Sequence, residues 1–337
     1  MSLKTPKFWS GLNWQSIILF PLSYIWRLGH YLNQQSTSPK KSDIPIICVG
    51  NLTVGGSGKT PVVITLCRFL SGIGKSPSVL TRGFGGREKG PIFVNSNLHQ
   101  SVDVGDEPLM MSNSNTVCVS RNRPVGADFI SSEKELDCVV MDDGLQNPTL
   151  EKDLKIAVFD GKFGIGNGLL LPAGPMREQL EDGLKNVDIV IFNGEDETGL
   201  TQKILSHIPI FTGELRPDDE IIEQMKGRRV YGFAGIGNPP RFFKTLQNIG
   251  ADIVGEAHFA DHHPYNDTDM SQLYEEANQA GSELVTTQKD WMRLPAEWRE
   301  RVLTVPVRIH FSSADSIKIV SLLETTFKNV LSSQQLS

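Results

Sequence analysis

A glycine-rich turn between an apolar strand and an apolar helix constrains the fold of this chain more than any other feature. The predicted strand covers residues 45–49, and the predicted helix covers residues 62–70. The turn between them is Thr53-Val54-Gly55-Gly56-Ser57-Gly58-Lys59-Thr60. Strand, glycine-rich loop and helix in this order are the context that a phosphate-binding P-loop requires. The sequence therefore predicts an α/β protein that binds a nucleotide.

Each part of the turn has a chemical role in this interpretation. Small residues allow backbone N–H groups to surround the β- and γ-phosphates, and Lys59 adds a mobile positive charge. The hydroxyl of Thr60 can ligate Mg²⁺, and the helix directs its positive dipole end toward the same phosphates. Thr53 stands five residues before Gly58, where the usual pattern has glycine. The alternative is a flexible glycine loop that binds nothing, and the flanking strand and helix argue against it.

Strands and helices alternate along the rest of the chain. Further strands are predicted at 77–81, 116–120, 136–141, 155–159 and 188–192, with helices at 127–134 and 176–184. This alternation predicts a doubly wound, mostly parallel sheet, with ligands beyond the carboxyl ends of its strands. After an acidic connector over 214–223, a second series has strands at 229–232, near 253, at 283–287 and at 302–309, and helices at 240–248 and 314–331. We therefore predict a P-loop domain over 36–215, joined by a C-terminal helix at 306–332, and a second, smaller α/β domain over 216–305.

Bulk composition limits the classes of function. The chain has 337 residues, which is enough for two domains with full cores. Its net charge of −6 gives no electrostatic indication of a nucleic acid partner. Four widely spaced cysteines, with no C-x-x-C pair, indicate buried free thiols in a reducing compartment rather than a zinc site. We therefore expect the body of the protein to be cytoplasmic.

The N-terminal segment, residues 1–35, has an amphipathic pattern. Its apolar side is Trp14, Ile18, Pro21, Ile25, Leu28 and Leu32, at alternating spacings of four and three. Its polar side is Ser16, Ser23, Arg27, His30 and Gln34. Polar interruptions argue against a membrane-spanning helix. The segment lacks a small-residue cleavage site, which argues against a signal peptide. We predict a helix, kinked or started near Pro21, that lies on an anionic membrane surface, and the alternative is a helix packed on the protein's own core.

Three charged motifs are candidates for chemistry. Asp142 and Asp143 follow the predicted strand 136–141, where P-loop enzymes carry the carboxylate that holds Mg²⁺, although Asp-Asp-Gly also suits a turn. Asp106 precedes a short apolar helix, and by itself it is best explained as a helix cap. His262, between Asp261 and His263, suits a metal site, an acid–base group or a surface loop.

A fourth motif, Thr287-Gln288-Lys289-Asp290, weakly resembles the base-reading loop of GTPases. In a GTPase that loop belongs to the P-loop domain, whereas this motif falls in the predicted second domain.

Together these motifs resemble the tetraacyldisaccharide 4′-kinase family, the lipid A 4′-kinases of Gram-negative bacteria. They occur in the family's order and span most of the chain, and Thr53 is itself normal for the family. The segments that carry the resemblance are 49–61, Thr81-Arg82-Gly83, Gly105-Asp106-Glu107-Pro108, Asp142-Asp143-Gly144-Leu145-Gln146, Pro172-Ala173-Gly174-Pro175-Met176-Arg177-Glu178, Asp261-His262-His263 and Thr287-Gln288-Lys289-Asp290.

The resemblance implies a function and roles for these residues. It implies transfer of phosphate from ATP–Mg²⁺ to the 4′-hydroxyl of a tetraacylated disaccharide 1-phosphate, which forms lipid IVA. It also implies a cleft between the two domains, peripheral attachment at the cytoplasmic face of the bacterial inner membrane, and Asp106 as general base with His262 as its partner. The candidates for holding substrate or γ-phosphate are Arg82, Arg123, Arg177 and Glu178, for which structural contacts are the alternative.

Two other classes of function stay open at this point. One is a P-loop GTPase or metal-insertion chaperone, which a strong preference for GTP would indicate. The other is a nucleotide-dependent membrane-binding module without transfer chemistry, whose function would survive loss of Asp106.

Overall fold

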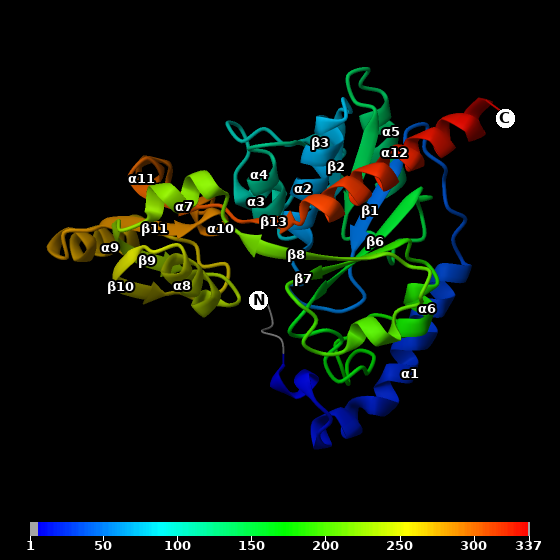
Figure 1. Cartoon of the computed structure of the whole chain (residues 1–337), viewed down its shortest axis with the longest axis horizontal. Coiled ribbons are helices and arrows are strands. Elements are labelled where there is room, and N and C mark those ends of the chain that lie inside the picture. The colour runs from blue at the N-terminus through cyan, green and yellow to red at the C-terminus, as the bar shows by residue number, and fades with distance from the viewer. Residues whose placement is uncertain (1–5, 336–337) are drawn as a thin grey trace.

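The computed structural model describes residues 6–335, which form a larger, mostly parallel β-sheet and a smaller parallel β-sheet with helices packed around them (Figure 1). The larger sheet has the strand order β13-β8-β7-β6-β1-β5-β2-β4-β3. Its strands are β1 (Ile46–Gly50), β2 (Pro77–Thr81), β3 (Ile92–Phe93), β4 (Thr116–Val119), β5 (Cys138–Asp142), β6 (Leu154–Asp160), β7 (Ile189–Asn193), β8 (Ile210–Arg216) and β13 (Arg308–Phe311). Only the edge strands β3 and β13 run antiparallel to their neighbours. The predicted α/β fold with a doubly wound parallel sheet is confirmed.

The central strands of the larger sheet are apolar because helices cover both of its faces. All five residues of β1 are buried. The helices of this part are α2 (Lys59–Gly72), α3 (Ser101–Val104), α4 (Asp106–Met111), α5 (Arg123–Ser131), α6 (Leu180–Leu184), η2 (Leu200–Lys203) and the C-terminal α12 (Ser313–Gln335). We call this part the large lobe. The four cysteines are buried and unpaired, as predicted.

The second sheet is all parallel, in the order β10-β9-β11-β12, and we call this part the small lobe (Figure 1). Its strands are β9 (Arg229–Ala234), β10 (Asp252–His258), β11 (Glu283–Thr287) and β12 (Val302–Val305). Its helices are α7 (Asp219–Met225), α8 (Pro239–Asn248), α9 (Asp267–Gln279), α10 (Gln288–Trp291) and α11 (Ala296–Arg299). Strands β8 and β13, which pair with each other, carry the chain between the two lobes.

Three predicted elements differ from the structure. The single strand predicted at 302–309 is two strands in two sheets, because Pro306 lacks a backbone donor and interrupts the ladder. The acidic connector predicted at 214–223 is the end of β8 and helix α7. The helix predicted at 176–184 is reduced to α6, because the N–H groups of Met176 and Arg177 bond to the carbonyl oxygens of Leu169 and Leu52.

The N-terminal segment forms η1 (Lys7–Ser10) and the long helix α1 (Trp14–Gln35), which begins at an Asn13 cap and continues through Pro21. Its predicted apolar side faces outward, and Trp14, Ile18 and Ile25 are 68%, 64% and 69% exposed. Its polar side faces the large lobe, where the Ser23 hydroxyl donates to the Leu170 carbonyl oxygen at 2.9 Å. The helix therefore packs on the large lobe, as the alternative has it, but through its polar side, and its apolar side is part of no core. Contact of that apolar side with a membrane stays a prediction. Residues 1–5 of the predicted segment lie outside the described residues.

Among residues 6–335, no helix is both long enough and apolar enough to cross a membrane.

Candidate active site

A cleft of about 2420 Å³ lies between the carboxyl ends of the large sheet's strands and the loops of the small lobe. It brings together most of the predicted site residues, which come from distant parts of the chain. Those that line it are Thr53, Val54, Gly55, Gly56, Ser57, Lys59, Arg82, Asp106, Arg123, Asp142, Asp143, Arg177 and His262.

The P-loop has the backbone shape that its glycines predict. Gly58 has φ +87°, a left-handed conformation that glycine adopts readily, and helix α2 begins at the next residue, Lys59. A Cβ atom at Gly58 would lie 2.5 Å from Nδ2 of Asn193, so no other residue fits there without a shift. The turn therefore ends directly at a helix N-terminus, which is the arrangement that binds phosphate.

Lys59 lies among oxygen atoms at the floor of the cleft. Its Nζ is 3.2 Å from Oδ1 of Asn51 and 3.6 Å from Oδ1 of Asp143. Arg177 holds both oxygens of Asp143, with Nη1–Oδ1 3.1 Å and Nη2–Oδ2 3.3 Å. Burial by itself raises the pKa of Asp143, but the charges of Lys59 and Arg177 outweigh it and hold that pKa below its usual value. Asp143 is therefore an ionised carboxylate with its oxygens already engaged.

Asp142 has the opposite environment. It is fully buried at the end of β5, and burial, with the nearby charge of Glu107, raises its pKa to about 7. Its Oδ2 accepts from the Thr81 hydroxyl at 3.5 Å, whereas its Oδ1 has no hydrogen-bond partner. Since a buried carboxylate oxygen without a partner is costly, a cation at this position would stabilise it.

The oxygen donors around Asp142 fit Mg²⁺. Glu107 Oε2 accepts from the Thr60 hydroxyl at 3.4 Å, which places a second carboxylate beside the P-loop. Among residues 6–335, no group of three or more His, Cys, Asp or Glu side chains is arranged to hold a metal. Mg²⁺ suits such a sparse site, because it usually keeps several waters and takes one or two carboxylates together with substrate phosphates.

The predicted pair of Asp106 and His262 meets across the two lobes. Nδ1 of His262, in the loop between β10 and α9, lies 2.7 Å from Oδ2 of Asp106 at the start of α4. The N-cap of α4 is Gly105, with no side-chain cap, so Asp106 does not serve as the helix cap. Nε of Arg293 lies 3.0 Å from the same Oδ2 atom. Burial alone raises the pKa of Asp106, but the His262 hydrogen bond and the Arg293 charge hold it below its usual value.

The four substrate candidates have different surroundings. Arg82 is exposed at the cleft, and Arg177 lines the cleft while holding Asp143. Arg123 is buried and donates to the carbonyl oxygens of Ser120 at 2.8 Å and Asp142 at 3.2 Å, so it supports the turn that carries the aspartates. Glu178 does not line the cleft, and its Oε1 accepts from Nε2 of Gln146 at 2.8 Å.

Sequence reasoning missed Arg293. Its partner Asp106 is far away along the chain, and no spacing rule connects them. The available signal was the motif Thr287–Asp290, which begins α10 and places Arg293 one helical turn after its aspartate. This motif adjoins the cleft through Lys289, whose Nζ is 3.5 Å from Oε1 of Glu107.

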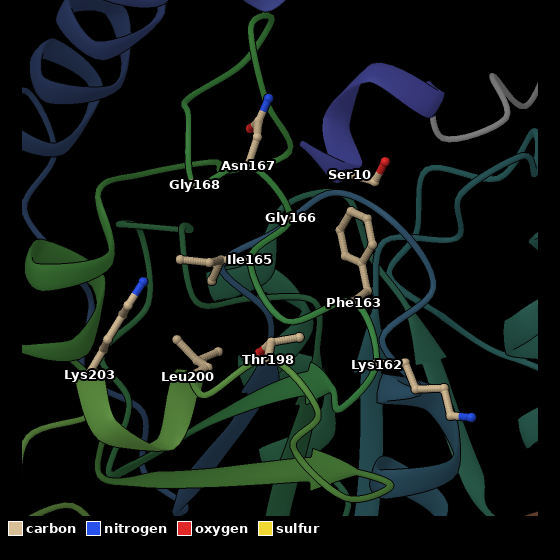
Figure 2. A pocket seen from close by; sticks show the side chains of 10 residues that line it. All are labelled: Ser10, Lys162, Phe163, Ile165, Gly166, Asn167, Gly168, Thr198, Leu200 and Lys203. Atoms are coloured by element: carbon tan, nitrogen blue, oxygen red, sulfur yellow. The ribbon is translucent and has the colours of Figure 1, made fainter. Parts of the chain in front are cut away.

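A smaller pocket of about 340 Å³ lies beneath η1, between the loop 162–168 and residues 198–203 (Figure 2). Ser10 reaches its rim from η1, with the Phe163 ring beside it, and Thr198 and Leu200 lie on the opposite side from η1 (Figure 2). None of the predicted site residues lines this pocket.

Comparison with known proteins gives one consistent result. A sequence model of the family described as "Tetraacyldisaccharide-1-P 4'-kinase" matches residues 15–327. A "Tetraacyldisaccharide 4'-kinase" of Bradyrhizobium sp. is 40% identical over 94% of this chain and 94% of its own length. One of Rhodospirillum rubrum is 41% identical over 92% of this chain and 94% of its own.

The fold comparison agrees with the sequence comparison. A crystal structure of LpxK from Aquifex aeolicus in complex with ATP superposes with a TM-score of 0.76 at 26% identity, covering 93% of this chain and 99% of that one. The P-loop cleft described above is thus found in a chain that matches the family along nearly its whole length. This chain belongs to the tetraacyldisaccharide-1-P 4'-kinase family.

Proposed function

We propose that this kinase transfers the γ-phosphate of ATP to the 4′-hydroxyl of a tetraacyldisaccharide 1-phosphate and so forms lipid IVA. One observation carries the proposal: the pair of His262 and Asp106 lines the same cleft as the P-loop. An alcohol beside this pair can therefore meet a phosphate held in the loop. The GTPase or metal-insertion alternative has no support in the comparisons.

The P-loop would hold the triphosphate. Backbone N–H groups from residues 54–60 and the N-terminus of α2 would surround the β- and γ-phosphates, with Lys59 between them. Asn51, which accepts from Lys59, would keep the ammonium group directed into the cradle. Charge that develops on the transferred phosphoryl group is thereby offset without reorganisation of the protein.

Thr60, Asp142 and Glu107 would hold Mg²⁺, which neutralises charge on the phosphates when it is bound. We favour Asp142 over Asp143 as the carboxylate that contacts the metal. The Oδ1 atom of Asp142 is buried and without a partner, whereas Lys59 and Arg177 already engage Asp143. In this assignment Asp143 fixes the positions of the Lys59 ammonium group and the Arg177 guanidinium group.

The roles of Asp106 and His262 are best explained as the reverse of those that the resemblance implies. Asp106 Oδ2 faces two cationic or polar donors, and its lowered pKa makes it a weak base. The side chain of His262 is 38% exposed, against 11% for Asp106, and imidazole is the commonest general base of enzymes. We infer that Nε2 of His262 takes the proton of the 4′-hydroxyl, whose oxygen attacks the γ-phosphorus while the bond to the β-phosphate breaks and ADP leaves. Asp106 holds the imidazole through Nδ1.

Helix α1 would attach the enzyme to the bilayer in which the acyl chains of its substrate lie. Its exposed apolar side supports this proposal, since an amphipathic helix of this kind lies in the membrane interface. Peripheral attachment at the cytoplasmic face of the inner membrane would bring the cleft to the sugar headgroup. The small lobe, over about 216–305 in the predicted division, would close the cleft over the nucleotide.

The test is incubation of the protein with radiolabelled ATP and a tetraacylated disaccharide 1-phosphate in mixed micelles. We expect a labelled lipid product with wild type and none with Lys59→Ala. This substitution removes the ammonium group that faces the phosphates and leaves the fold intact. A parallel incubation with labelled GTP should give far less product. Strong GTP hydrolysis without labelled lipid would contradict the proposal.

A further inference from the structure

The motif Thr287–Asp290 has no part in the steps above, although it lies next to them. Asp290 is fully buried, and its carboxylate accepts from four donors. Its Oδ1 accepts from the backbone N–H of Gly235 at 3.0 Å, the Tyr265 hydroxyl at 3.1 Å and Nη1 of Arg293 at 3.2 Å. Its Oδ2 accepts from the Thr287 hydroxyl at 2.7 Å. A charge buried so completely, with all its partners in one lobe, fixes positions more than it adds stability.

Arg293 extends this network to the other lobe. Its side chain is 5% exposed, and it is held by Asp290 and by the Gly235 carbonyl oxygen, which accepts from Nη1 at 3.1 Å. Its Nε faces Oδ2 of Asp106 at 3.0 Å. The guanidinium therefore joins the buried carboxylate of the small lobe to the cleft carboxylate of the large lobe.

The same network holds the loop of His262. The Gly235 carbonyl oxygen also accepts from the backbone N–H of His262 at 3.1 Å. A Cβ atom at Gly235 would lie 2.9 Å from the Tyr265 hydroxyl and 3.1 Å from Oδ1 of Asp290, so glycine keeps this junction tight. Asp290 thus positions both members of the cleft pair: Asp106 through Arg293, and His262 through Gly235.

We propose that Arg293, anchored by Asp290, is a positioning residue that orients Asp106 toward His262 only when the two lobes are together. This inference rests on the proposed roles of Asp106 and His262. The imidazole and the guanidinium both approach the same oxygen, Oδ2: His262 Nδ1 by a hydrogen bond and Arg293 Nε by an ion pair without hydrogen-bond geometry. The charge beside Oδ2 therefore favours the one carboxylate orientation in which that oxygen meets the imidazole. Lysine cannot reproduce this arrangement, because its single ammonium lacks the planar fork that reaches Asp290, Gly235 and Asp106 together.

A double-mutant cycle tests the proposal. Arg293→Gln should lower kcat by about 100-fold, the loss typical of a small misplacement of a reacting group, with little change in KM for ATP. In the Asp106→Asn background the same substitution should cost at most about twofold, because residues that act through one another are not additive. Arg293→Lys should behave similarly, and it keeps a charge beside Asp290 if Arg293→Gln does not fold.

A matched control lies in the same lobe. Arg299 donates from Nε to the Leu294 carbonyl oxygen at 3.2 Å and from Nη2 to that of Met292 at 3.0 Å, but it does not line the cleft. Arg299→Gln should lower the melting temperature and leave kcat unchanged. Equal losses from Arg293→Gln in both backgrounds, or no loss in wild type, would overturn the positioning role alone. An unaffected Asp106→Asn variant would instead overturn the proposed roles of the cleft pair.

Discussion

Two residues beside the cleft hold backbone conformations that side chains rarely adopt. Asp143 has φ +51° and His262 has φ +61°. Such conformations cost on the order of 1–3 kcal/mol each and persist only where their surroundings hold them. Arg177 and Lys59 hold Asp143, and Asp106 and the Gly235 carbonyl oxygen hold His262. The two strained residues are thus on opposite sides of the site that we propose for phosphoryl transfer.

The first prediction concerns His262. His262→Ala should lower kcat by about 10²–10⁴-fold, the usual contribution of a general base, while the Kd for ATP stays near that of wild type. Asp106→Asn should cost less than this, since it leaves the imidazole in place. Steady-state kinetics with the lipid substrate, together with ATP binding by calorimetry, measures both quantities. A larger loss for Asp106→Asn than for His262→Ala would instead make the aspartate the base.

The second prediction concerns the buried carboxylate of Asp142. Its pKa is raised to about 7 in the fold, against about 3.9 in an unfolded chain, so the folded state binds the proton more tightly. The contribution to stability is therefore complete below about pH 4 and lost as the pH rises to about 7. In metal-free protein at about pH 8, Asp142→Asn should raise the free energy of unfolding by up to about 4 kcal/mol.

Denaturant unfolding of the metal-free protein at two pH values measures this effect. The variant should have a flatter pH dependence than wild type and should lose Mg²⁺–ATP binding. The assignment would be contradicted if wild-type stability rose between about pH 4 and about pH 7 and Asp142→Asn removed that rise. Asp153→Asn is the control, at a second carboxyl whose pKa is also raised by burial.

At the scale of elements, α1 is seated on the large lobe by its polar side. Asn167 donates from Nδ2 to the Ser16 hydroxyl at 3.0 Å, and Trp26 donates from Nε1 to the Arg177 carbonyl oxygen at 2.7 Å. The latter contact ties the helix to a residue of the cleft. These hydrogen bonds orient α1 on the large lobe, and its apolar side is therefore free to contact lipid.

The third prediction concerns that apolar side. Ile18→Glu and Ile25→Glu should shift the protein from lipid vesicles to the aqueous phase, because a charge on the interfacial side opposes insertion. The melting temperature should not fall, since both side chains are already exposed. Ile317→Glu on α12, where the side chain is 71% exposed, is the matched control and should not change vesicle binding. Equal partitioning of all three variants would show that α1 is not the attachment.

For the whole molecule, charges are segregated across the cleft. In every pair that spans the cleft, the small lobe supplies the cation or imidazole and the large lobe supplies the carboxylate. Beside β8 and β13 the polarity is reversed, because Arg216 and Arg308 of the large lobe pair with Asp219 and Asp218 at the start of α7. A further pair joins α8 to β6, with Nη1 of Arg241 3.5 Å from Oδ2 of Asp160. An exposed pair of this kind contributes about 0–1 kcal/mol to stability when it acts alone. Association of the two lobes is therefore favoured by the pairs across the cleft acting together.

The fourth prediction follows from this segregation. Raising salt from about 0.1 M to about 1 M shortens the Debye length from about 10 Å to about 3 Å and should separate the lobes in the absence of nucleotide. Small-angle scattering should show a larger radius of gyration at high salt. Arg241→Gln should show part of that increase already at low salt, and Arg228→Gln, whose partner Glu283 lies within the small lobe, should not. A radius that is independent of salt would contradict the prediction.

The parts of the molecule that sequence predicts well are those whose causes are local. The P-loop, β2 and β11 lie where the residues predict them, because glycine conformation and short apolar runs act over a few neighbours. The periodicity of α1 predicted an apolar side available to a membrane, and that side is exposed, but the periodicity could not predict that the polar side is seated on the large lobe. The placement of Arg293 beside Asp106 depends on which distant segments come together, and no spacing in the chain encodes this. The split of β12 from β13 has a local signal in Pro306, but the sequence does not say that the two strands join different sheets.

The seating of α1 has a consequence for how such an enzyme would work between two phases. The apolar side of α1 is not part of a hydrophobic core. Detachment of the helix from lipid would therefore require no repacking and no refolding of the protein. A molecule built in this way can sample the bilayer, leave with its machinery intact, and begin again elsewhere on the same sheet of lipid.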